Sequence, residues 1–403
     1  MPSTILSDNG VSSGSAGLKT TASNDGILAL QTTTAGGAAT TAVTIGTNQA
    51  VTFAQAANLP NTFGFKNRII NGAMVIDQRN AGASVTPTAS QYSLDRWNLS
   101  LTAASKFSFQ QSSTAPTGFS NSLLFTSLSA YSVGSSDFFL ANQWIEGFNT
   151  ADLMWGTANA QTVTISFWVR SSLTGTFGGS ITNSGQTRSY PFTYTISSAN
   201  TWEQKSVTIA GDTTGTWLTT NGRGIGVWFG LGAGSTYSST AGAWAAGAYY
   251  SATGATSVVG TNGATFYITG VQLEKGSTAT SFDFRSYGTE LALCQRYYYR
   301  NSQSGSATGT LGFGVSVSTT QSDIQIPFPV TMRSAPTFNY GGSPIVTDSI
   351  GYNLSVSSIA NQYANQQAMR TFLNHAATAT VRSPATLSHI ASNSAFVELT
   401  AEL

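Results

Sequence analysis

The chain has 403 residues, 40% of them apolar, which is enough for two or three domains with a buried core. Only 8% of the residues are charged, against about 25% in an average globular protein, and the formal net charge is +1. The few basic residues are scattered, which argues against nucleic-acid binding, because that requires a basic stripe. No apolar run is long enough to span a membrane, so no membrane insertion is expected.

Low charge combined with abundant Ser and Thr and 41 Gly favours a chain whose surface is shared with copies of itself, as in a fibre. A secreted monomer of low charge is the alternative. The N-terminus, from Met1 to Leu6, lacks a basic stretch followed by an apolar stretch, so no signal peptide is expected. The single cysteine, Cys294, excludes an intrachain disulfide and is predicted to be a packed small side chain.

Residues 1–64 form a first segment that is almost free of charge. It contains three short apolar runs, Ile27 to Leu30, Ala42 to Ile45 and Ala50 to Phe53, with a predicted turn at Gly46 to Gln49 between the last two. One copy cannot bury its own apolar face, whereas three copies wrapped about an axis can. The segment is therefore predicted to be an extended β stem in a homotrimer. A disordered low-complexity linker is the alternative.

Residues 65–285 show strand-like alternation of apolar or aromatic side chains at every second position. The segments that alternate in this way are Thr162 to Val169, Tyr190 to Ile196, Lys205 to Ile209, Gly224 to Phe229 and Thr265 to Leu273. Turns are predicted at Gly175 to Gly179 and at Asn183 to Gly185, and Trp97, Trp168 and Trp228 are predicted to be core residues. Many short strands without alternating helices predict a β-sandwich of the jelly-roll type.

Residues 286–403 begin with the best helix candidate of the chain, Gly288 to Tyr299. Strand-like segments then return, and they are Leu311 to Val317, Asp323 to Phe328, Thr337 to Tyr340 and Ala395 to Leu399. A small C-terminal β-sandwich is expected. The predicted fold class is thus all-β throughout, with three domains at 1–64, 65–285 and 286–403.

Four segments stand out in chain order, namely Asn67 to Arg79, Tyr92 to Trp97, Gly270 to Gly276 and Glu290 to Tyr298. Together they are similar to segments of the tail fibres and receptor-binding proteins of tailed bacteriophages. The order of the central strands also resembles the carbohydrate-binding jelly rolls of glycoside hydrolases and phage fibres. The resemblance implies a structural protein of the virion, made in the host cytoplasm, whose N-terminal region attaches to a tail or capsid protein and which adsorbs to host surface glycans.

Catalytic and metal-binding signatures are weak. The two histidines, His375 and His389, lie near the C-terminus without a nucleophile motif, and with one cysteine they do not make a zinc site. Glycoside cleavage needs two carboxylates about 5 to 10 Å apart, and the acids considered for it are Asp137, Glu146, Asp152, Glu203, Asp212 and Glu274. Glu274 and Asp283 are instead predicted to bond backbone groups or to cap the end of the jelly roll. Jelly rolls of this kind often hold calcium through an acid where this chain has Gly270, which puts that site in doubt. No cofactor and no metal are predicted, and the chain is expected not to be an enzyme.

Aromatic residues in the loop-like stretch Gly232 to Gly263 are the candidate glycan contacts, because sugar CH faces stack on exposed rings. These candidates are Trp244, Tyr249, Tyr250 and Tyr237. Packing against a neighbouring subunit is the other interpretation of the same residues. A tail fibre that adsorbs to host polysaccharide is the predicted function. A head fibre or capsid decoration without a receptor role and a polysaccharide depolymerase are the alternatives.

Overall fold

The protein is all-β, as the sequence predicts. The computed structural model describes residues 19–22, 28–32, 40–45, 51–53, 65–302, 309–348, 353–375, 379–389 and 396–403. It forms two compact units, Met1–Thr62 and Phe63–Leu403. No helix of the described residues is long enough to cross a bilayer.

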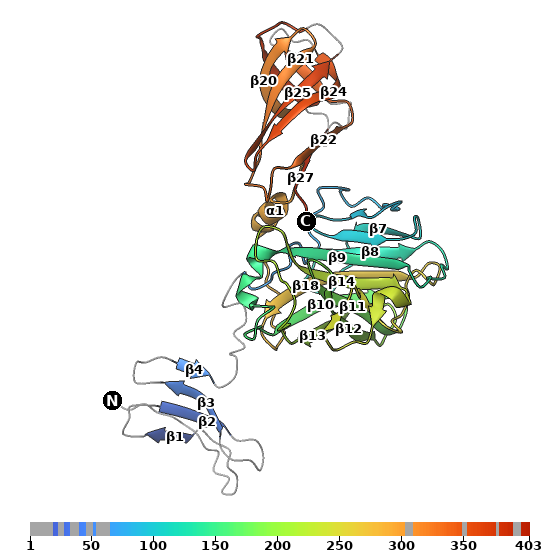
Figure 1. The fold of residues 1–403 in the computed structure, drawn as a ribbon, viewed down its shortest axis with the longest axis vertical. Coiled ribbons are helices and arrows are strands. Elements are labelled where there is room, and N and C mark those ends of the chain that lie inside the picture. Colours follow the sequence, from blue (N-terminus) through green and yellow to red (C-terminus); the bar gives the residue numbers. More distant parts are fainter. Residues whose placement is uncertain are drawn as a thin grey trace. The chain divides into compact units, whose positions relative to one another are not determined.

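The first unit contains four antiparallel strands in chain order. They are β1 (Lys19–Ala22), β2 (Leu28–Thr32), β3 (Thr40–Ile45) and β4 (Val51–Phe53) (Figure 1). The three apolar runs predicted to be strands fall on β2, β3 and β4. The expected turn at Gly46 to Gln49 lies outside the described residues, and the trimeric stem stays a prediction.

The second unit begins with a two-sheet sandwich (Figure 1). One sheet has five strands in the order β13 (Glu203–Ile209), β10 (Val163–Ser171), β18 (Thr265–Lys275), β8 (Ser122–Ser127) and β7 (Phe107–Ser112). The other has seven, in the order β16 (Ala245–Ala246), β12 (Arg188–Ile196), β11 (Gly175–Asn183), β14 (Arg223–Ala233), β9 (Phe138–Glu146), β6 (Asn98–Leu101) and β5 (Gln91–Tyr92).

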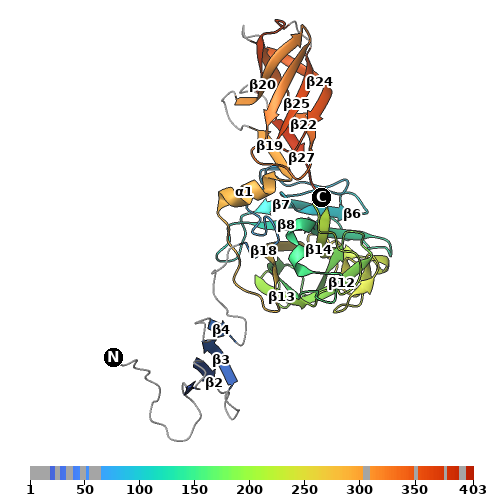
Figure 2. The same cartoon turned by 60° about the vertical axis from the view of Figure 1, so that its left-hand side comes forward.

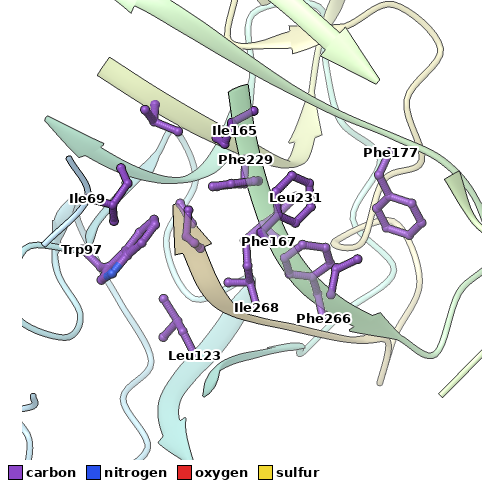
Figure 3. Packing of buried hydrophobic residues seen from close by; sticks show 14 of the residues in the cluster. Ile69, Trp97, Leu123, Ile165, Phe167, Phe177, Phe229, Leu231, Phe266 and Ile268 are labelled. Carbon is purple, nitrogen blue, oxygen red and sulfur yellow. The ribbon is translucent and has the colours of Figure 1, made fainter. Parts of the chain in front are cut away.

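Short elements connect these strands. They are the 3₁₀ turns η1 (Gly147–Asn149), η2 (Ala151–Leu153) and η3 (Ser235–Tyr237), and the parallel pair β15 (Ser238–Ser239) and β17 (Ser251–Ala252). The core lies between the two sheets (Figure 3). Phe167 of β10, Phe266 of β18 and Phe229 of β14 are fully buried there, as the period-2 alternation of each strand requires.

Two details of the sandwich differ from the sequence prediction. Gly175 to Gly179 is not a turn but the start of β11. A Cβ on Gly179 would lie 2.5 Å from Cζ of Phe192, so glycine here permits close packing of neighbouring side chains within the sheet. Trp168 is not a core residue but is half-buried, because its neighbours Phe167 and Val169 take the two inward positions of β10. Trp97 and Trp228 are buried as predicted.

The predicted helix forms as α1 (Tyr287–Gln295), and its expected last turn instead begins a three-stranded sheet. That sheet consists of β19 (Tyr298–Ser302), β27 (Phe396–Thr400) and β22 (Thr337–Gly341) (Figure 2). The expected small sandwich takes the form of this sheet and a closed barrel. The barrel order is β20 (Gly309–Ser318), β21 (Gln321–Pro327), β25 (Ala368–His375), β24 (Asn353–Ala364), β23 (Ile345–Asp348) and β26 (Pro384–His389).

Asn71 joins segments that are far apart in the sequence. It is fully buried and has a left-handed backbone with φ 57°. Its carboxamide accepts the amide of Ile76 at 3.0 Å and donates to the carbonyl oxygens of Ile76 and Asp95 at 2.8 and 3.0 Å. Its backbone carbonyl accepts Nε1 of Trp97 at 3.0 Å, and its amide donates to the carboxylate of Glu290. Three of the four segments noted in the sequence, Asn67 to Arg79, Tyr92 to Trp97 and Glu290 to Tyr298, therefore meet at one residue.

The fourth segment joins through Asn67. The side chain of Asn67 forms two hydrogen bonds with the backbone of β18. Its Oδ1 accepts a hydrogen bond from the amide of Leu273 at 3.1 Å, and its Nδ2 donates to the carbonyl oxygen of Val271 at 3.1 Å. The backbone amide of Val271 also donates to the carbonyl of Gly72 at 2.9 Å. Since β8 pairs with β18 only as far as Ile268, the chain from Asn67 to Gly72 lies along the rest of β18.

Buried ionisable side chains lie beside this junction. Asp95 is fully buried. Its carboxyl oxygens accept hydrogen bonds from the backbone amide of Gln78 at 2.6 Å and from the side-chain Nε2 of Gln78 at 2.9 Å. Glu402 forms ion pairs with both Arg79 and Arg96. Residues near the two ends of the second unit are thereby held together by charge-assisted bonds inside the protein.

Replacing Asn71 with Ala should lower the free energy of unfolding by about 3 kcal/mol or more, because several buried polar groups lose their partners. The matched control is Asn200→Ala, since Asn200 has φ 56° and an exposed side chain. Asn200→Ala should lower the free energy of unfolding by only about 1 kcal/mol, which is the cost of placing alanine in a left-handed backbone conformation. Urea unfolding of the full chain measures both, and equal losses would show that the buried carboxamide contributes nothing.

Folding should depend on pH through Asp95, whose pKa burial raises from 3.8 to about 7. The folded state then keeps a proton that the unfolded chain releases above pH of about 4. Stability should therefore fall as pH rises from about 4 to about 7, by up to roughly 1.4 kcal/mol per pH unit. Unfolding curves at pH 5 and 7 test this against Asp95→Asn, which does not titrate. An unchanged slope in the variant would contradict the assignment.

Candidate functional site

The two sheets of the sandwich differ in what covers their outer faces. On the seven-stranded sheet, Trp144 and Trp228 project outward but are only 5% and 3% exposed. Their rings lie 5.5 Å apart, edge to face, and Tyr250 covers Trp228 at 4.6 Å. Tyr237 stacks on Tyr250 at 5.5 Å with an interplanar angle of 19°. This face is thus closed by the chain's own loop.

Two of the four predicted glycan contacts belong to this cover. Tyr250 is buried and its hydroxyl donates to Oε1 of Gln186 at 2.8 Å, while Tyr237 is half-buried and its ring lies 5.0 Å from that of Phe138. Both rings are engaged in intrachain packing. Their predicted role as contacts came from the small-residue composition of the loop, which does not reveal what lies beneath it.

The other two predicted contacts lie elsewhere. Trp244 is half-buried and packs edge to face against Trp155 and Trp217, with ring centres 5.4 and 5.5 Å away. Its Nε1 donates to the carbonyl of Ala210 at 2.8 Å. Tyr249 is half-buried, and its amide donates to Oγ of Ser189 at 3.1 Å. The structure therefore divides the four candidates into separate environments, and glycan contact stays a prediction for them.

The outer face of the five-stranded sheet is open and carries aromatic and amide side chains in rows. In one row Trp168 of β10 stands opposite Gln204 of β13. The next row runs across four strands, with Arg170, Tyr267, Leu124 and Gln110 as successive partners. Gln204 is exposed, and the other five are half-buried. We call these six residues, with Trp202 and Phe119 beside them, the aromatic face.

The rings of the aromatic face are held at its two sides. Trp202 lies 6.0 Å from Tyr267, and the guanidinium of Arg170 lies 5.1 Å over the same Tyr267 ring. Arg170 is itself fixed, because its Nε donates to the carbonyl of Asn200 at 2.9 Å. Rings that are oriented in advance lose little entropy when a ligand stacks on them.

Gly270 makes room for the other side of this face. Its φ is 60°, and the pairing of β10 with β18 shifts register here, as in a bulge with a left-handed glycine. A Cβ at this position would lie 2.7 Å from Cζ of Phe119 and 3.1 Å from Cδ1 of Trp168. Glycine at 270 thus brings these two rings together over the sheet, whereas the sequence indicated only that a calcium ligand is missing at this position.

Amide groups supply the polar part of the aromatic face. The carboxamides of Gln110 and Gln204 take part in none of the hydrogen bonds formed among the described residues. A carboxamide both donates and accepts, as a sugar hydroxyl does. Half-buried rings with unengaged carboxamides beside them form the combination of groups that binds a neutral, hydroxyl-rich ligand.

The six acids considered for glycoside cleavage are each bonded within the chain. Glu146 is buried, held by Arg296 at 2.7 Å and by the hydroxyl of Tyr297 at 2.6 Å. The amide of Gly134 lowers the pKa of Asp137. Asp152 pairs with Arg68, Glu203 with Lys205, and Asp212 with Arg188.

Glu274 accepts the amide of Thr280 at 2.8 Å, and Asp283 accepts the amide of Asn67 at 3.2 Å, so both bond backbone groups as predicted. His375 is buried, with Nε2 3.1 Å from Oγ of Ser322, and the side chain of His389 lies outside the described residues. Cys294 is buried, and burial raises the pKa of its thiol. The described part of the chain has no cluster of three or more His, Cys, Asp or Glu that could hold a metal.

Comparisons with known proteins reveal only distant likenesses. No protein-family profile and no curated protein matches the chain. The enzymatically active domain of tailspike protein 4 of bacteriophage CBA120 aligns at 12% identity over 52% of this chain and 22% of its own length, with a TM-score of 0.29. The chain thus spans about a fifth of that protein.

Carbohydrate-binding modules also align. The family 11 module from Clostridium thermocellum, in complex with a β-1,3-1,4-mixed-linked tetrasaccharide, covers 48% of this chain and 98% of its own length, at 10% identity and a TM-score of 0.25. The CBM22-1 xylan-binding domain from Paenibacillus barcinonensis Xyn10C covers 50% and 99%, at 9% identity and 0.23. Likeness at these TM-scores is too distant to carry a conclusion, and the interpretation of the site rests on its residues.

The packing role of Tyr250 is testable against its sequence neighbour. Tyr250→Ala should lower the free energy of unfolding by about 3 kcal/mol, because a buried ring leaves a cavity. Tyr249→Ala removes a half-buried ring of the same size and should cost about 1 kcal/mol. Urea unfolding compares the two. Similar small losses in both variants would mean that the ring of Tyr250 does not cover the sheet.

Proposed function

We propose that this protein is a non-enzymatic adhesive appendage of a bacteriophage virion, which adsorbs to host surface polysaccharide through the aromatic face of its sandwich. The observation that carries the binding part of the proposal is the pairing of oriented rings, Trp168, Tyr267 and Trp202, with the carboxamides of Gln110 and Gln204. Rings stack on the CH faces of sugars, and carboxamides bind their hydroxyls.

The shape of this face suits an extended chain of sugars. Its residues come from all five strands of one open sheet, and they form rows rather than a single closed pocket. A polysaccharide offers repeated CH faces to such rows. Binding at one copy is expected to be weak, and a homotrimer with several fibres on one particle supplies avidity.

The virion part of the proposal rests on the four segments that resemble phage fibres. Asn67, Asn71 and their partners give these segments a common physical role, since all four meet in one buried junction. The N-terminal unit is proposed to attach to a tail or capsid protein. The absence of cleavage is proposed because the six acids considered for it are already bonded within the chain.

Trp168→Ala and Tyr267→Ala should each weaken binding to polysaccharide by about tenfold, which corresponds to about 1.4 kcal/mol. The matched control is Tyr363→Ala, because Tyr363 is 61% exposed on β24 of the barrel. The full chain is first screened against an array of bacterial capsular and lipopolysaccharide glycans, and dissociation constants are then measured for the glycans retained.

Three outcomes oppose this proposal. Retention of no glycan by the full chain favours a decoration without a receptor role. If Tyr363→Ala weakens polysaccharide binding as much as Trp168→Ala and Tyr267→Ala do, the aromatic face is not the binding site. Release of new reducing ends from a retained polysaccharide, abolished by substitution of an acid with its amide, shows that the protein is an enzyme.

A further inference from the structure

A cavity of about 400 Å³ lies at the edge of the aromatic face. Phe119 belongs to both, since it lines the cavity and also packs with Trp168 over Gly270. A volume of this size falls within the range of small-molecule sites in proteins. The cavity is therefore placed to receive one part of a ligand whose remainder lies along the rows of the sheet.

One wall of the cavity is formed by three phenylalanines. The ring centres of Phe119, Phe282 and Phe284 are 4.8 to 5.2 Å apart in all three pairings. Phe284 remains 58% exposed although it lies in this cluster. An apolar corner of this kind favours a methyl-bearing group over a bare hydroxyl, since burying a hydroxyl without a partner is unfavourable.

The polar wall of the cavity carries more acceptors than donors. Asp283 and Glu290 are both 8% exposed, and Arg285 is the cation among the cavity-lining residues. Arg285 contacts Glu290 at 3.2 Å and also donates to the carbonyls of Asn67 and Ile69. Two carboxylates against one guanidinium disfavour an anionic sugar and leave a neutral one as the suitable ligand.

Arg285 has one group without a partner. Its Nε is buried and makes no hydrogen bond, and among the five arginines in that state it is the one that lines this cavity. An unpaired buried donor costs about 1 to 3 kcal/mol. A carbonyl oxygen in the cavity would relieve that cost once a shift of the Arg285 side chain brings the buried Nε to the cavity surface. An acetyl substituent supplies both such an oxygen and a methyl group for the phenylalanine corner.

We infer that this cavity is a subsite for a neutral sugar residue bearing an acetyl group, as the acetylated unit of the polysaccharide that the aromatic face is proposed to bind. The inference rests on the proposed function and adds the chemistry of one sugar unit. The sugar ring meets Phe119 beside the sheet, and the acetyl group enters between Phe282, Phe284 and Arg285.

The test uses saturation-transfer NMR on the full chain with three methyl glycosides, those of N-acetylglucosamine, glucose and glucuronic acid. We expect the acetyl methyl protons to receive the strongest saturation, and both other glycosides to bind at least fivefold more weakly. Equal binding of glucose or of glucuronic acid, or no transfer to the acetyl methyl, would overturn the inference.

Two variants locate the binding. Phe284→Ala should weaken binding of the N-acetylglucosamine glycoside at least fivefold. Ser120→Trp should block the cavity, because Ser120 is exposed at its rim. Tyr287→Ala is the control, because Tyr287 is 63% exposed near the cavity but does not line it. Unchanged binding in both cavity variants, or an equal loss in the control, contradicts the assignment.

The inference and the proposed function fail separately. If the glycoside does not bind while retention of polysaccharide still depends on Trp168, the cavity is not a subsite and the proposed function stands. If the glycoside binds in the cavity but the full chain retains no polysaccharide, the subsite stands as a site for a small acetylated sugar and the proposed function falls.

Discussion

The second unit depends on one buried carboxamide. Asn71 sits in a left-handed backbone conformation that few residues adopt without cost, and asparagine is among those that do. From that position its side chain and backbone bond Ile76, Asp95, Trp97 and Glu290. No other side chain of similar size provides both a donor and an acceptor together with tolerance of this backbone. The segments that meet here come from residues 67 to 298, so the contact order is high and the junction forms only when the whole unit folds.

The same junction explains how the proposed binding surface obtains its shape. The chain from Asn67 to Gly72 lies along β18 beyond the end of β8. It thus forms one wall of the cavity beside Phe119, while β18 itself contributes Tyr267 and the glycine bulge at 270. A scaffold of strands and buried hydrogen bonds, rather than a flexible loop, therefore positions the proposed contacts. Such support is what keeps a recognition site oriented before its ligand arrives.

Much of the fold follows from local sequence. The alternation in β10, β12, β13, β14 and β18 predicts those strands, since one face of each is buried against the other sheet. Gly178 and Gly179 mislead, because glycine marks turns in most sequences but here permits close packing of side chains against the sheet. The closed barrel could not be predicted from local sequence, since closure depends on the pairing of β20 with β26 across about 70 to 80 residues.

The site was harder to predict than the fold. Tyr237 and Tyr250 have the same composition around them as an exposed loop, and only the three-dimensional structure shows Trp228 beneath them. For Trp168 the error is the reverse, since it was predicted to be a core residue and lies on the outer face. A tryptophan within a strand suggests a core residue until its two neighbours are assigned to the inner face. The signal that was present is that Trp168 shares its phase of the alternation with Ser166 and Arg170, whereas Phe167 and Val169 belong to the purely apolar phase that faces inward. Phe119 and the cavity carry no local signal, since they arise from contacts with β18 and residues 282–285.

The scarcity of charge has a consequence for the conditions under which such a surface works. In the rows of the aromatic face Arg170 is the one ionised group, and a ring and a backbone carbonyl already engage it. Contacts made by rings and carboxamides act over a few ångströms and are not screened by dissolved ions, in contrast to attraction between opposite charges. Adhesion built in this way would hold nearly equally well in fresh water and in brine, and it would give no long-range pull toward a charged envelope.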